Sequence, residues 1–263
     1  MNAITLADIR ALTEAADEKQ LEALERSLAS DTRKGVAQAF KRAHERLDAQ
    51  RKEAERLAGI YGFQAALAEE AGAQCVVGID EVGRGPLAGP LAVGAVVLPP
   101  EPMIEGLNDS KQVREVDRQG IADAIKEVAI AYAVEFIEPD VIDEIGIMAA
   151  LRKAFSSAVS AIESQGQPVD MILLDGNPMG FDPRERNIIK GDAKCASIAA
   201  ASILAKVERD NLMDELDSKY PGYGLANNKG YGTKPHMDAI RKLGLSDIHR
   251  RSYCSEFLQE TLF

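Results

Sequence analysis

Two apolar runs, separated by a charged and glycine-rich turn, constrain the fold of this chain more than any other feature. Residues 75–79 (CVVGI) and 91–98 (LAVGAVVL) are rich in β-branched side chains and are bounded by glycine and proline, a pattern typical of buried strands. Asp80 and Glu81 follow the first run directly, so two carboxylates stand at the end of a buried strand. Charge beside a core is costly unless it is paired, so the rest of the chain must supply a partner.

The remainder of the chain after residue 98 alternates between helical and strand-like patterns. The pattern predicts, in order, strand 75–80, strand 91–98, helix 115–127, strand 129–137, helix 140–163, strand 169–174, strand 186–191 and helix 194–219. Short connections between the first three strands indicate antiparallel pairing, and the later strand–helix alternation indicates parallel additions. We therefore expect an α/β fold with a mixed five-stranded sheet flanked by helices, followed by a glycine-rich loop and two short C-terminal helices. Small residues at the start of helix 194–219 predict close packing on the sheet.

Residues 1–72 have a different composition, because they contain many good helix formers and no proline. The sequence predicts two parts: a helical N-terminal extension over 1–72, and an α/β domain with a C-terminal helical segment over 73–263. The net charge of −11 argues against a nucleic-acid partner only if it is averaged over the whole chain. Residues 33–56 are locally basic, and this stretch is either an ordinary solvated helix or one that follows a phosphate backbone.

Cysteine usage and hydropathy indicate the compartment. The three cysteines have no metal-type spacing and form an odd set, which indicates free thiols in a reducing environment. The N-terminus lacks the apolar core of a signal peptide, and no apolar run approaches the roughly 20 residues of a membrane helix. We expect a cytoplasmic protein with no membrane partner.

Two further carboxylates occupy the same kind of position as Asp80 and Glu81. Asp175 ends the apolar run 171–174, and Asp192 follows the strand-like run 187–191. If the predicted topology holds, three strand ends deliver four carboxylates to one rim of the sheet. Such a set suits a hard divalent cation, Mg²⁺ or Mn²⁺, and such ions suit phosphodiester hydrolysis.

Each carboxylate also has an ordinary structural interpretation. Asp192 could be the N-cap of the next helix, Asp175 with Gly176 could form a turn, and the first pair could be one exposed charge and one cap. The histidines, at positions 44, 236 and 249, are scattered, so neither a zinc site nor a histidine acid–base pair is expected. A glycine-flanked arginine at 83–85 suits close approach to a phosphate, although the same triplet could be a flexible turn.

Several separated motifs together resemble bacterial ribonuclease HII, a type 2 ribonuclease H. They occur in the family's order at residues 78–98, 107–111, 173–176, 190–210, 220–236 and 248–252. The resemblance implies a ribonuclease H-like fold. It also implies an endonuclease that cuts the RNA strand of RNA–DNA hybrids and incises 5′ to a single ribonucleotide in duplex DNA. The expected products are a 5′-phosphate and a 3′-hydroxyl. A monomer is expected on the same grounds.

The resemblance also implies roles for individual residues. Four carboxylates match the family's catalytic metal ligands, which hold two Mn²⁺ or Mg²⁺ ions: Asp80, Glu81, Asp175 and Asp192. Seven residues match substrate contacts: Gly83, Arg84 and Gly85 at the nucleotide being cut, Tyr231 at the ribose, and Asn108, Ser110 and Lys111 on the backbone. A tyrosine that senses the 2′-hydroxyl is sensible, because that group alone distinguishes RNA from DNA at one position. Arg84 favours this family over its sister, ribonuclease HIII, which lacks the arginine.

Other functions remain open at the level of sequence. A DNA-only nuclease of the same fold would cut an all-DNA duplex equally well. A non-catalytic protein that binds RNA–DNA hybrids would bind without cutting in either metal. A small-molecule α/β enzyme is the least supported, since the chain has neither a phosphate loop nor a dinucleotide fingerprint.

Overall fold

The computed structural model describes residues 4–259 of the chain, so the outermost residues of both predicted domains, 1–3 and 260–263, lie outside the described residues. The chain forms two compact units, and the division between them falls between Ala58 and Gly59. This division lies inside one long helix, α3 (Lys34–Ala71). The domain boundary expected at 72/73 follows the end of this helix and stays a prediction.

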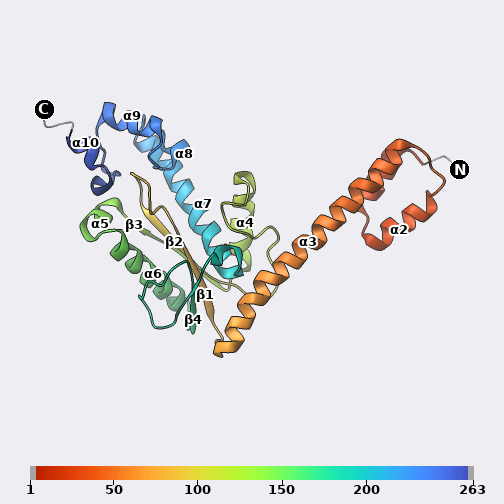
Figure 1. Cartoon of the computed structure of the whole chain (residues 1–263), viewed down its shortest axis with the longest axis horizontal. Coiled ribbons are helices and arrows are strands. Elements are labelled where there is room, and N and C mark those ends of the chain that lie inside the picture. Colours follow the sequence, from red (N-terminus) through yellow and green to blue (C-terminus); the bar gives the residue numbers. More distant parts are fainter. Residues whose placement is uncertain (1–3, 260–263) are drawn as a thin grey trace. The chain divides into compact units, whose positions relative to one another are not determined.

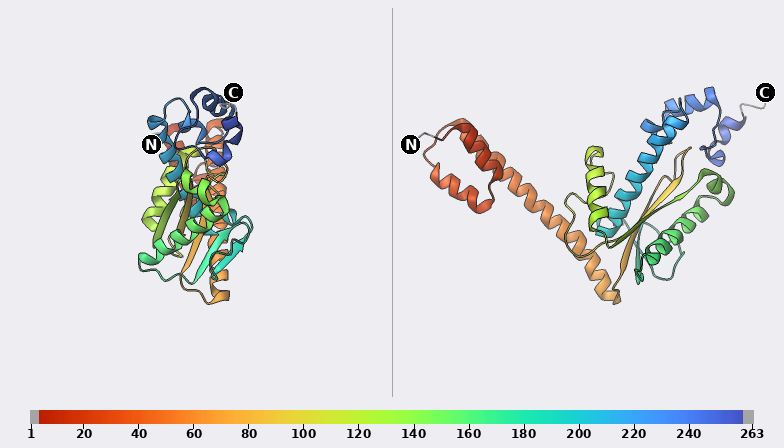
Figure 2. Two further views of the ribbon diagram at one scale, coloured as in Figure 1. Left: turned by 90° about the vertical axis from the view of Figure 1, so that its left-hand side faces the viewer. Right: turned by 180° about the vertical axis from the view of Figure 1, so that it is seen from behind.

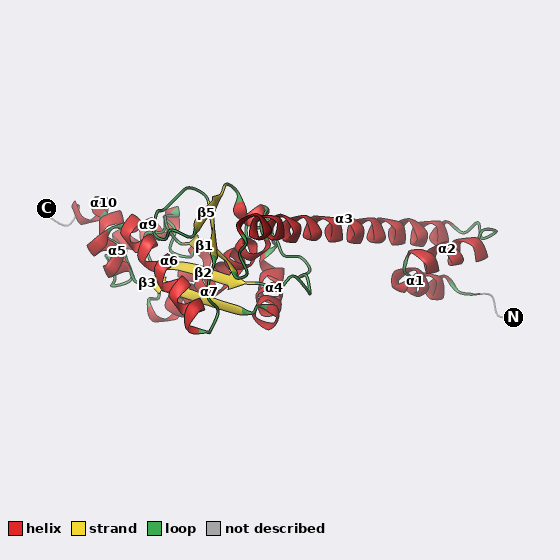
Figure 3. Ribbon diagram, turned by 90° about the horizontal axis from the view of Figure 1, so that it is seen from below, coloured by secondary structure: helices red, strands yellow, loops and turns green. Residues whose placement is uncertain are grey.

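The first unit is helical, as its composition predicts. It contains α1 (Leu6–Ala15), α2 (Glu18–Ser27) and the N-terminal part of α3 (Figure 3). Thr5 and Asp17 are the N-caps of the first two helices, and each forms a capping box. The cap side chain accepts the backbone N–H of the third helical residue, and the side chain of that residue accepts the backbone N–H of the cap. Two small apolar clusters hold this unit together, one around Ile9 and the other around Leu21.

The second unit is built on a five-stranded mixed sheet (Figure 1). The strands are β1 (Val76–Val82), β2 (Leu91–Val97), β3 (Ala131–Ile137), β4 (Met171–Asp175) and β5 (Glu185–Ile188). Their order is β3-β2-β1-β4-β5, with antiparallel β1–β2 and β2–β3 pairs and parallel β1–β4 and β4–β5 pairs. The predicted combination of an antiparallel piece with parallel additions is therefore confirmed.

Helices cover both faces of this sheet (Figure 2). α7 (Ala196–Lys219) lies across β1 and β2, with α4 (Glu115–Val128) beside it, and α6 (Ile147–Ser164) packs on the other face against β2 and β3. The approach of α7 is very close, because a Cβ built on Gly78 would lie 2.3 Å from the carbonyl carbon of Ser197. The close packing of α7 on the sheet, which its small residues predict, is thus confirmed, and β1 contributes a glycine to the same contact.

The predicted helix over 140–163 is wrong as a single helix. It is two helices, α5 (Pro139–Ile145) and α6, which meet at Gly146, a residue with φ of 77° that ends one helix and begins the other. The same pair is bent by 119°. Among the described residues no single helix is long and apolar enough to cross a membrane, and only this bent pair meets that test when its helices are taken together.

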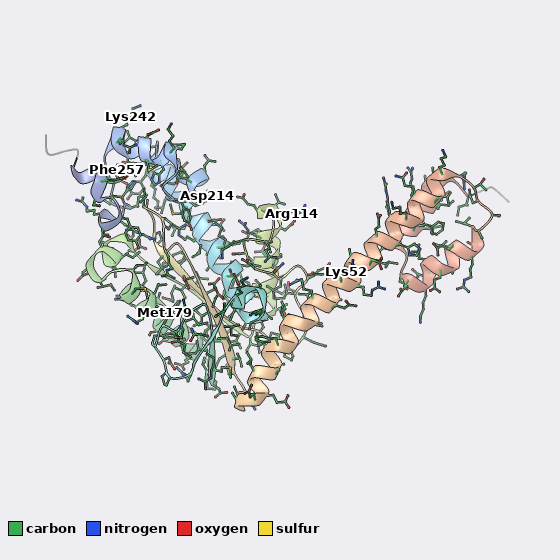
Figure 4. All side chains as sticks on the ribbon, viewed as in Figure 1. Lys52, Arg114, Met179, Asp214, Lys242 and Phe257 are labelled. Carbon is green, nitrogen blue, oxygen red and sulfur yellow. The ribbon has the colours of Figure 1, made fainter. Side chains whose placement is uncertain are left out.

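Three short helices close the far end of α7: α8 (Leu225–Asn228), α9 (Lys234–Leu243) and α10 (Ser255–Gln259). Met213 of α7, Tyr223, Ile240 and Phe257 are buried together there, and Figure 4 labels Phe257 on the last of these helices. The sequence predicts two short C-terminal helices, and the described residues form three. They matter for the site because the loop between α8 and α9 carries Tyr231.

Candidate active site

Asp80 lies within β1 and is almost fully buried, with 7% of its surface exposed. Its carboxylate accepts a hydrogen bond from the hydroxyl of Ser202 on α7, and Ser202 in turn lies 2.9 Å from the hydroxyl of Ser110. Burial, reinforced by the charge of Glu81, raises the pKa of Asp80 to about 8. This carboxyl group is therefore held in place by the Ser202 hydroxyl and by the N–H of Glu81, which donates to Oδ1 at 2.8 Å.

Glu81 is the next residue along β1, and alternation along the strand directs it away from α7. Arg84 donates to its carboxylate at 3.3 Å, and the other terminal nitrogen of Arg84 lies 3.9 Å from the sulfur of Met148 on α6. Burial raises the pKa of Glu81, and Arg84 opposes that shift. The arginine side chain is itself 53% exposed, so it can still reach a ligand outside the protein.

Asp175 and Asp192 are joined through one backbone contact. Asp175 ends β4, and its Oδ1 accepts the N–H of Gly191 at 2.6 Å. Gly191 opens the 3₁₀ turn η1 (Gly191–Ala193), which carries Asp192 beside the end of β4. Burial, followed by the charge of Asp175, raises the pKa of Asp192.

Asp192 does not cap the helix that follows it, as one interpretation of the sequence had it. The N-cap of α7 is Cys195, whose side chain makes no capping bond. The Ser197 N–H, in the first turn of α7, instead donates to Oε1 of Gln64 at 2.9 Å. The same oxygen accepts a hydrogen bond from the thiol of Cys195 at 3.2 Å. The charge of Asp192 is therefore not used to cap α7.

Lys111 is the cation beside Asp192, as Arg84 is the cation beside Glu81. Its Nζ lies 3.7 Å from Oδ2 of Asp192. Burial acts against its charge, but attraction to Asp109, Asp192, Asp80 and Asp175 outweighs burial and raises the pKa of Lys111. The four predicted carboxylates therefore lie in one electrostatic neighbourhood, at the ends of β1 and β4 and in η1.

Asn108 and Ser110 have local partners. The Asn108 side chain donates to Gln112 at 3.4 Å and accepts the N–H of Asp109, whereas Ser110 is buried against Ser202. Their assignment as backbone contacts of a substrate stays a prediction. Ser202 and Gln64 are supporting residues that sequence reasoning missed, since a serine in an alanine-rich helix and a glutamine in a long polar helix give no signal of their own.

The donor chemistry fits a hard divalent cation, although the side chains are not gathered into a ligand set. Within residues 4–259, no three Asp, Glu, His or Cys side chains are close enough together to hold an ion as they are placed. Alternation along β1 explains part of this, because it sends Asp80 and Glu81 to opposite faces. Four carboxylates opposed by Lys111 and Arg84 leave an excess of negative charge that oxygen-seeking cations would neutralise.

The remaining predicted contacts lie on two loops that touch each other. Gly83 has φ of 90°, and a Cβ there would lie 2.4 Å from Nε of Arg209, whereas Gly85 is open to solvent. Tyr231 is 42% exposed. The loops are joined at Gly230, whose carbonyl accepts the N–H groups of Leu87 and Ala88 at 2.9 and 3.2 Å. The loop that carries the glycine–arginine–glycine triplet is thus hydrogen-bonded to the loop that carries Tyr231.

Solved structures with a similar fold define the class of protein to which the chain belongs. Ribonuclease H2 from Pyrococcus horikoshii OT3 superposes with a TM-score of 0.60 at 26% identity, over 71% of this chain and 98% of that one. A ribonuclease HIII solved in complex with Mn²⁺ superposes with a TM-score of 0.55 over 76% of this chain and 74% of that one; its 21% identity carries the fold alone. The fold is that of the type 2 ribonucleases H.

Sequence comparisons define the family within that class. The family model for ribonuclease HII matches residues 77–256, and the model for the ribonuclease HII N-terminal domain matches residues 5–68. Ribonuclease HII from Listeria innocua serovar 6a is 42% identical over 223 residues, covering 85% of this chain and 84% of that one. The Bacillus cereus enzyme is 44% identical over 226 residues and covers 86% of each. The chain belongs to the ribonuclease HII family, and it is therefore a metal-dependent endonuclease of the ribonuclease H type.

Proposed function

We propose that this enzyme cuts the RNA strand of RNA–DNA hybrids and incises 5′ to a single ribonucleotide in duplex DNA, leaving a 5′-phosphate and a 3′-hydroxyl. The observation that carries the proposal is the placement of four carboxylates at β1, at the end of β4 and in η1, with Lys111 3.7 Å from Asp192 and an exposed Arg84 3.3 Å from Glu81. Such a surface suits a polyanion only when cations accompany it. We further propose that the enzyme acts as a monomer in the cytoplasm.

The four carboxylates would hold the metal. Two Mn²⁺ or Mg²⁺ ions bound by Asp80, Glu81, Asp175 and Asp192 would supply an activated water and would neutralise charge on the phosphate. The protein contributes position: Ser202 orients Asp80, and the N–H of Gly191 orients Asp175. These hydrogen bonds hold the two carboxylates in place, and the N–H of Glu81 adds a further bond to Oδ1 of Asp80 at 2.8 Å.

Substrate recognition is assigned to the two adjoining loops. Arg84 would contact the phosphate at the cut site, with the open backbone at Gly85 allowing close approach. The phenol of Tyr231 would lie against the ribose and sense its 2′-hydroxyl. Asn108, Ser110 and Lys111 are proposed for the substrate backbone, with Lys111 as a point charge.

The 2′-hydroxyl is proposed as a group that is read and not as the nucleophile. An attack by that hydroxyl needs a nearby base, and histidine is the usual one. His236 and His249 are buried against each other, and burial lowers the pKa of both. His44 lies in the other compact unit. These placements support hydrolysis by water and a 3′-hydroxyl product.

The proposal is tested with a labelled DNA duplex containing one ribonucleotide, beside an all-DNA duplex of the same sequence, in Mn²⁺ or Mg²⁺. We expect a single nick 5′ to the ribonucleotide, no cut in the control duplex, and no cut by Asp80→Asn. Asp123→Asn, an exposed carboxylate on α4, is the matched control and should cut normally. Equal cutting of both duplexes would identify a DNA nuclease instead. Binding without a nick in either metal would identify a hybrid-binding protein.

A further inference from the structure

Two arginines, Arg209 on α7 and Arg250 near the C-terminus, are fully buried, each with 0% of its surface exposed. Within the described part of the chain, neither forms an ion pair with a carboxylate. Burial lowers the pKa of Arg209 to about 10 and also lowers that of Arg250. A buried and unpaired guanidinium costs stability, and an apolar side chain would usually be more favourable. The bonds that these two guanidinium groups make therefore need an explanation.

Arg250 binds the two ends of the loop that carries the predicted triplet. Its Nη2 donates to the carbonyl of Gly83 at 2.7 Å, and its Nη1 donates to the carbonyl of Arg84 at 3.0 Å. The same guanidinium reaches the carbonyl of Gly89 with Nε at 3.0 Å and Nη2 at 2.8 Å. One rigid, forked cation thus fixes three carbonyls of an eight-residue turn between β1 and β2.

Arg209 joins this turn to the loop that carries Tyr231. Its Nε donates to the carbonyl of Pro90 at 2.9 Å, and Nη2 reaches that of Ala88 at 3.4 Å. Its Nη1 donates at 3.0 Å to the carbonyl of Lys229, two residues before Tyr231. Lys229 is held a second time, because its ammonium group pairs with Asp214 of α7, which Figure 4 labels.

The two loops are in close contact at Gly230. A Cβ on Gly230 would lie 2.1 Å from the carbonyl oxygen of Ala88. A Cβ on Gly83 would lie 2.4 Å from Nε of Arg209. Every carbonyl that the two arginines bind lies on one of these two loops, so the two guanidinium groups link the loops to each other.

We propose that Arg209 and Arg250 are positioning residues that hold residues 83–85 and Tyr231 as one rigid unit, and thereby set how strictly a 2′-hydroxyl must be in register with the cut site. The inference rests on the proposed function, since it takes these loops as the surface that reads the ribose. Lysine cannot replace either arginine, because it is a point charge without the planar fork that spans several carbonyls.

The consequence should differ between two substrates. In a long RNA–DNA hybrid every nucleotide carries a 2′-hydroxyl, so a loosened reading unit still meets one in most registers. In a duplex with a single ribonucleotide only one register is productive, so the same loosening lowers the rate much more. The ratio of kcat/KM for the single-ribonucleotide duplex to kcat/KM for the long hybrid therefore measures the positioning role.

The test compares Arg250→Met and Arg209→Met with Arg251→Met, an exposed neighbour as the matched control. We expect the ratio to fall at least tenfold in the first two, mainly through kcat on the single-ribonucleotide duplex, and to stay at the wild-type value in the control. A merely structural role would reduce the folded fraction and scale both substrates equally, which leaves the ratio unchanged. An unchanged ratio in the buried variants would overturn the inference.

Arg250→Lys keeps the measurement decisive if the methionine variants do not fold. It retains the charge but loses the fork, and we expect a ratio at least threefold below that of the wild type. A wild-type ratio for this variant would show that charge alone is enough and would also overturn the inference. Failure of the wild-type enzyme to nick the single-ribonucleotide duplex would instead refute the proposed function, so the two failures are distinguishable.

Discussion

Acid should weaken the fold through one buried pair of histidines, His236 and His249, whose Nε2 atoms lie 3.3 Å apart. Nδ1 of His236 lies 2.9 Å from the carbonyl of Tyr231, and Nδ1 of His249 lies 3.0 Å from the backbone N of Ser246. A carbonyl can only accept and an amide N–H can only donate. The network therefore assigns the proton to Nδ1 in His236 and to Nε2 in His249. All four ring nitrogens are in use, so a further proton would break one of these bonds.

The size of the effect follows from the pKa of His249, which burial, and then the neighbouring His236, lower from 6.5 to about 4. Below pH 6.5 the unfolded chain binds a proton at this position that the folded protein does not bind until about pH 4. Folding stability therefore falls as the pH falls through that window. At about 1.4 kcal/mol for each pH unit, the loss is about 3 kcal/mol. For a unit of this size it corresponds to a fall in Tm of roughly 10 °C.

His249→Gln removes the titration while keeping an acceptor for Ser246 and a donor for His236. We expect the variant to lose about 2–3 kcal/mol less than the wild type between pH 7 and pH 4.5, whatever its stability at pH 7. Urea unfolding followed by tyrosine fluorescence measures this directly, because all six tyrosines lie in the second compact unit and the chain has no tryptophan.

His44→Gln is the control for this experiment. His44 lies in the first unit, where it pairs with Glu25 at 2.7 Å on the surface, so this variant should show the full acid sensitivity of the wild type. Carboxylates also titrate in this pH range, and the comparison between variants cancels their contribution. Equal acid sensitivity in His249→Gln and the wild type would refute the argument from the buried pair.

Three further predictions concern the metal, the substrate and the helix α3. Mn²⁺ or Mg²⁺ should raise the Tm of the wild type but not that of Asp80→Asn, and EDTA should lower the nicking rate ~100-fold or more; a Tm rise in the variant would place the ion elsewhere. Arg42→Glu with Lys52→Glu should flatten the dependence of duplex affinity on log salt by about 2 units, whereas an unchanged slope would indicate an ordinary solvated helix. Arg46 is left intact there, because it binds the carbonyl of Ala16 at 2.5 Å. Gln64→Ala should lower the free energy of unfolding by ~1 kcal/mol, because the Ser197 N–H loses its acceptor; no change in a urea titration would contradict that role.

The strands and their order could be predicted because each is a short apolar run bounded by turn residues, and connection length separates antiparallel from parallel neighbours. The four carboxylates were visible for the same reason, since each stands where such a run ends. The break at Gly146 was missed because the apolar periodicity continues on both sides of it. One glycine within a helical pattern does not reveal a positive φ.

The supporting residues could not be predicted, because their partners are distant in sequence. Arg209 binds carbonyls 119 to 121 residues earlier in the chain, and Arg250 binds carbonyls more than 160 residues earlier. Every residue has a backbone carbonyl, so no sequence motif predicts a hydrogen bond from an arginine to a distant carbonyl. Arg250 lies within the segment 248–252 that resembles the family. Its neighbour Arg251 is exposed, and the sequence alone does not show which of the two arginines is buried.

The path of α3 determines where the chain can be shortened without damage to the nuclease. A fragment begun at the apparent sequence boundary, residue 73, would lack Tyr61, which accepts the N–H of Ile104, as well as Gln64 and the packing of Leu67 on the sheet. Those contacts all belong to the second compact unit, which starts at Gly59. The last turns of α3 are thus part of the packed nuclease unit, and a minimal catalytic fragment should keep them.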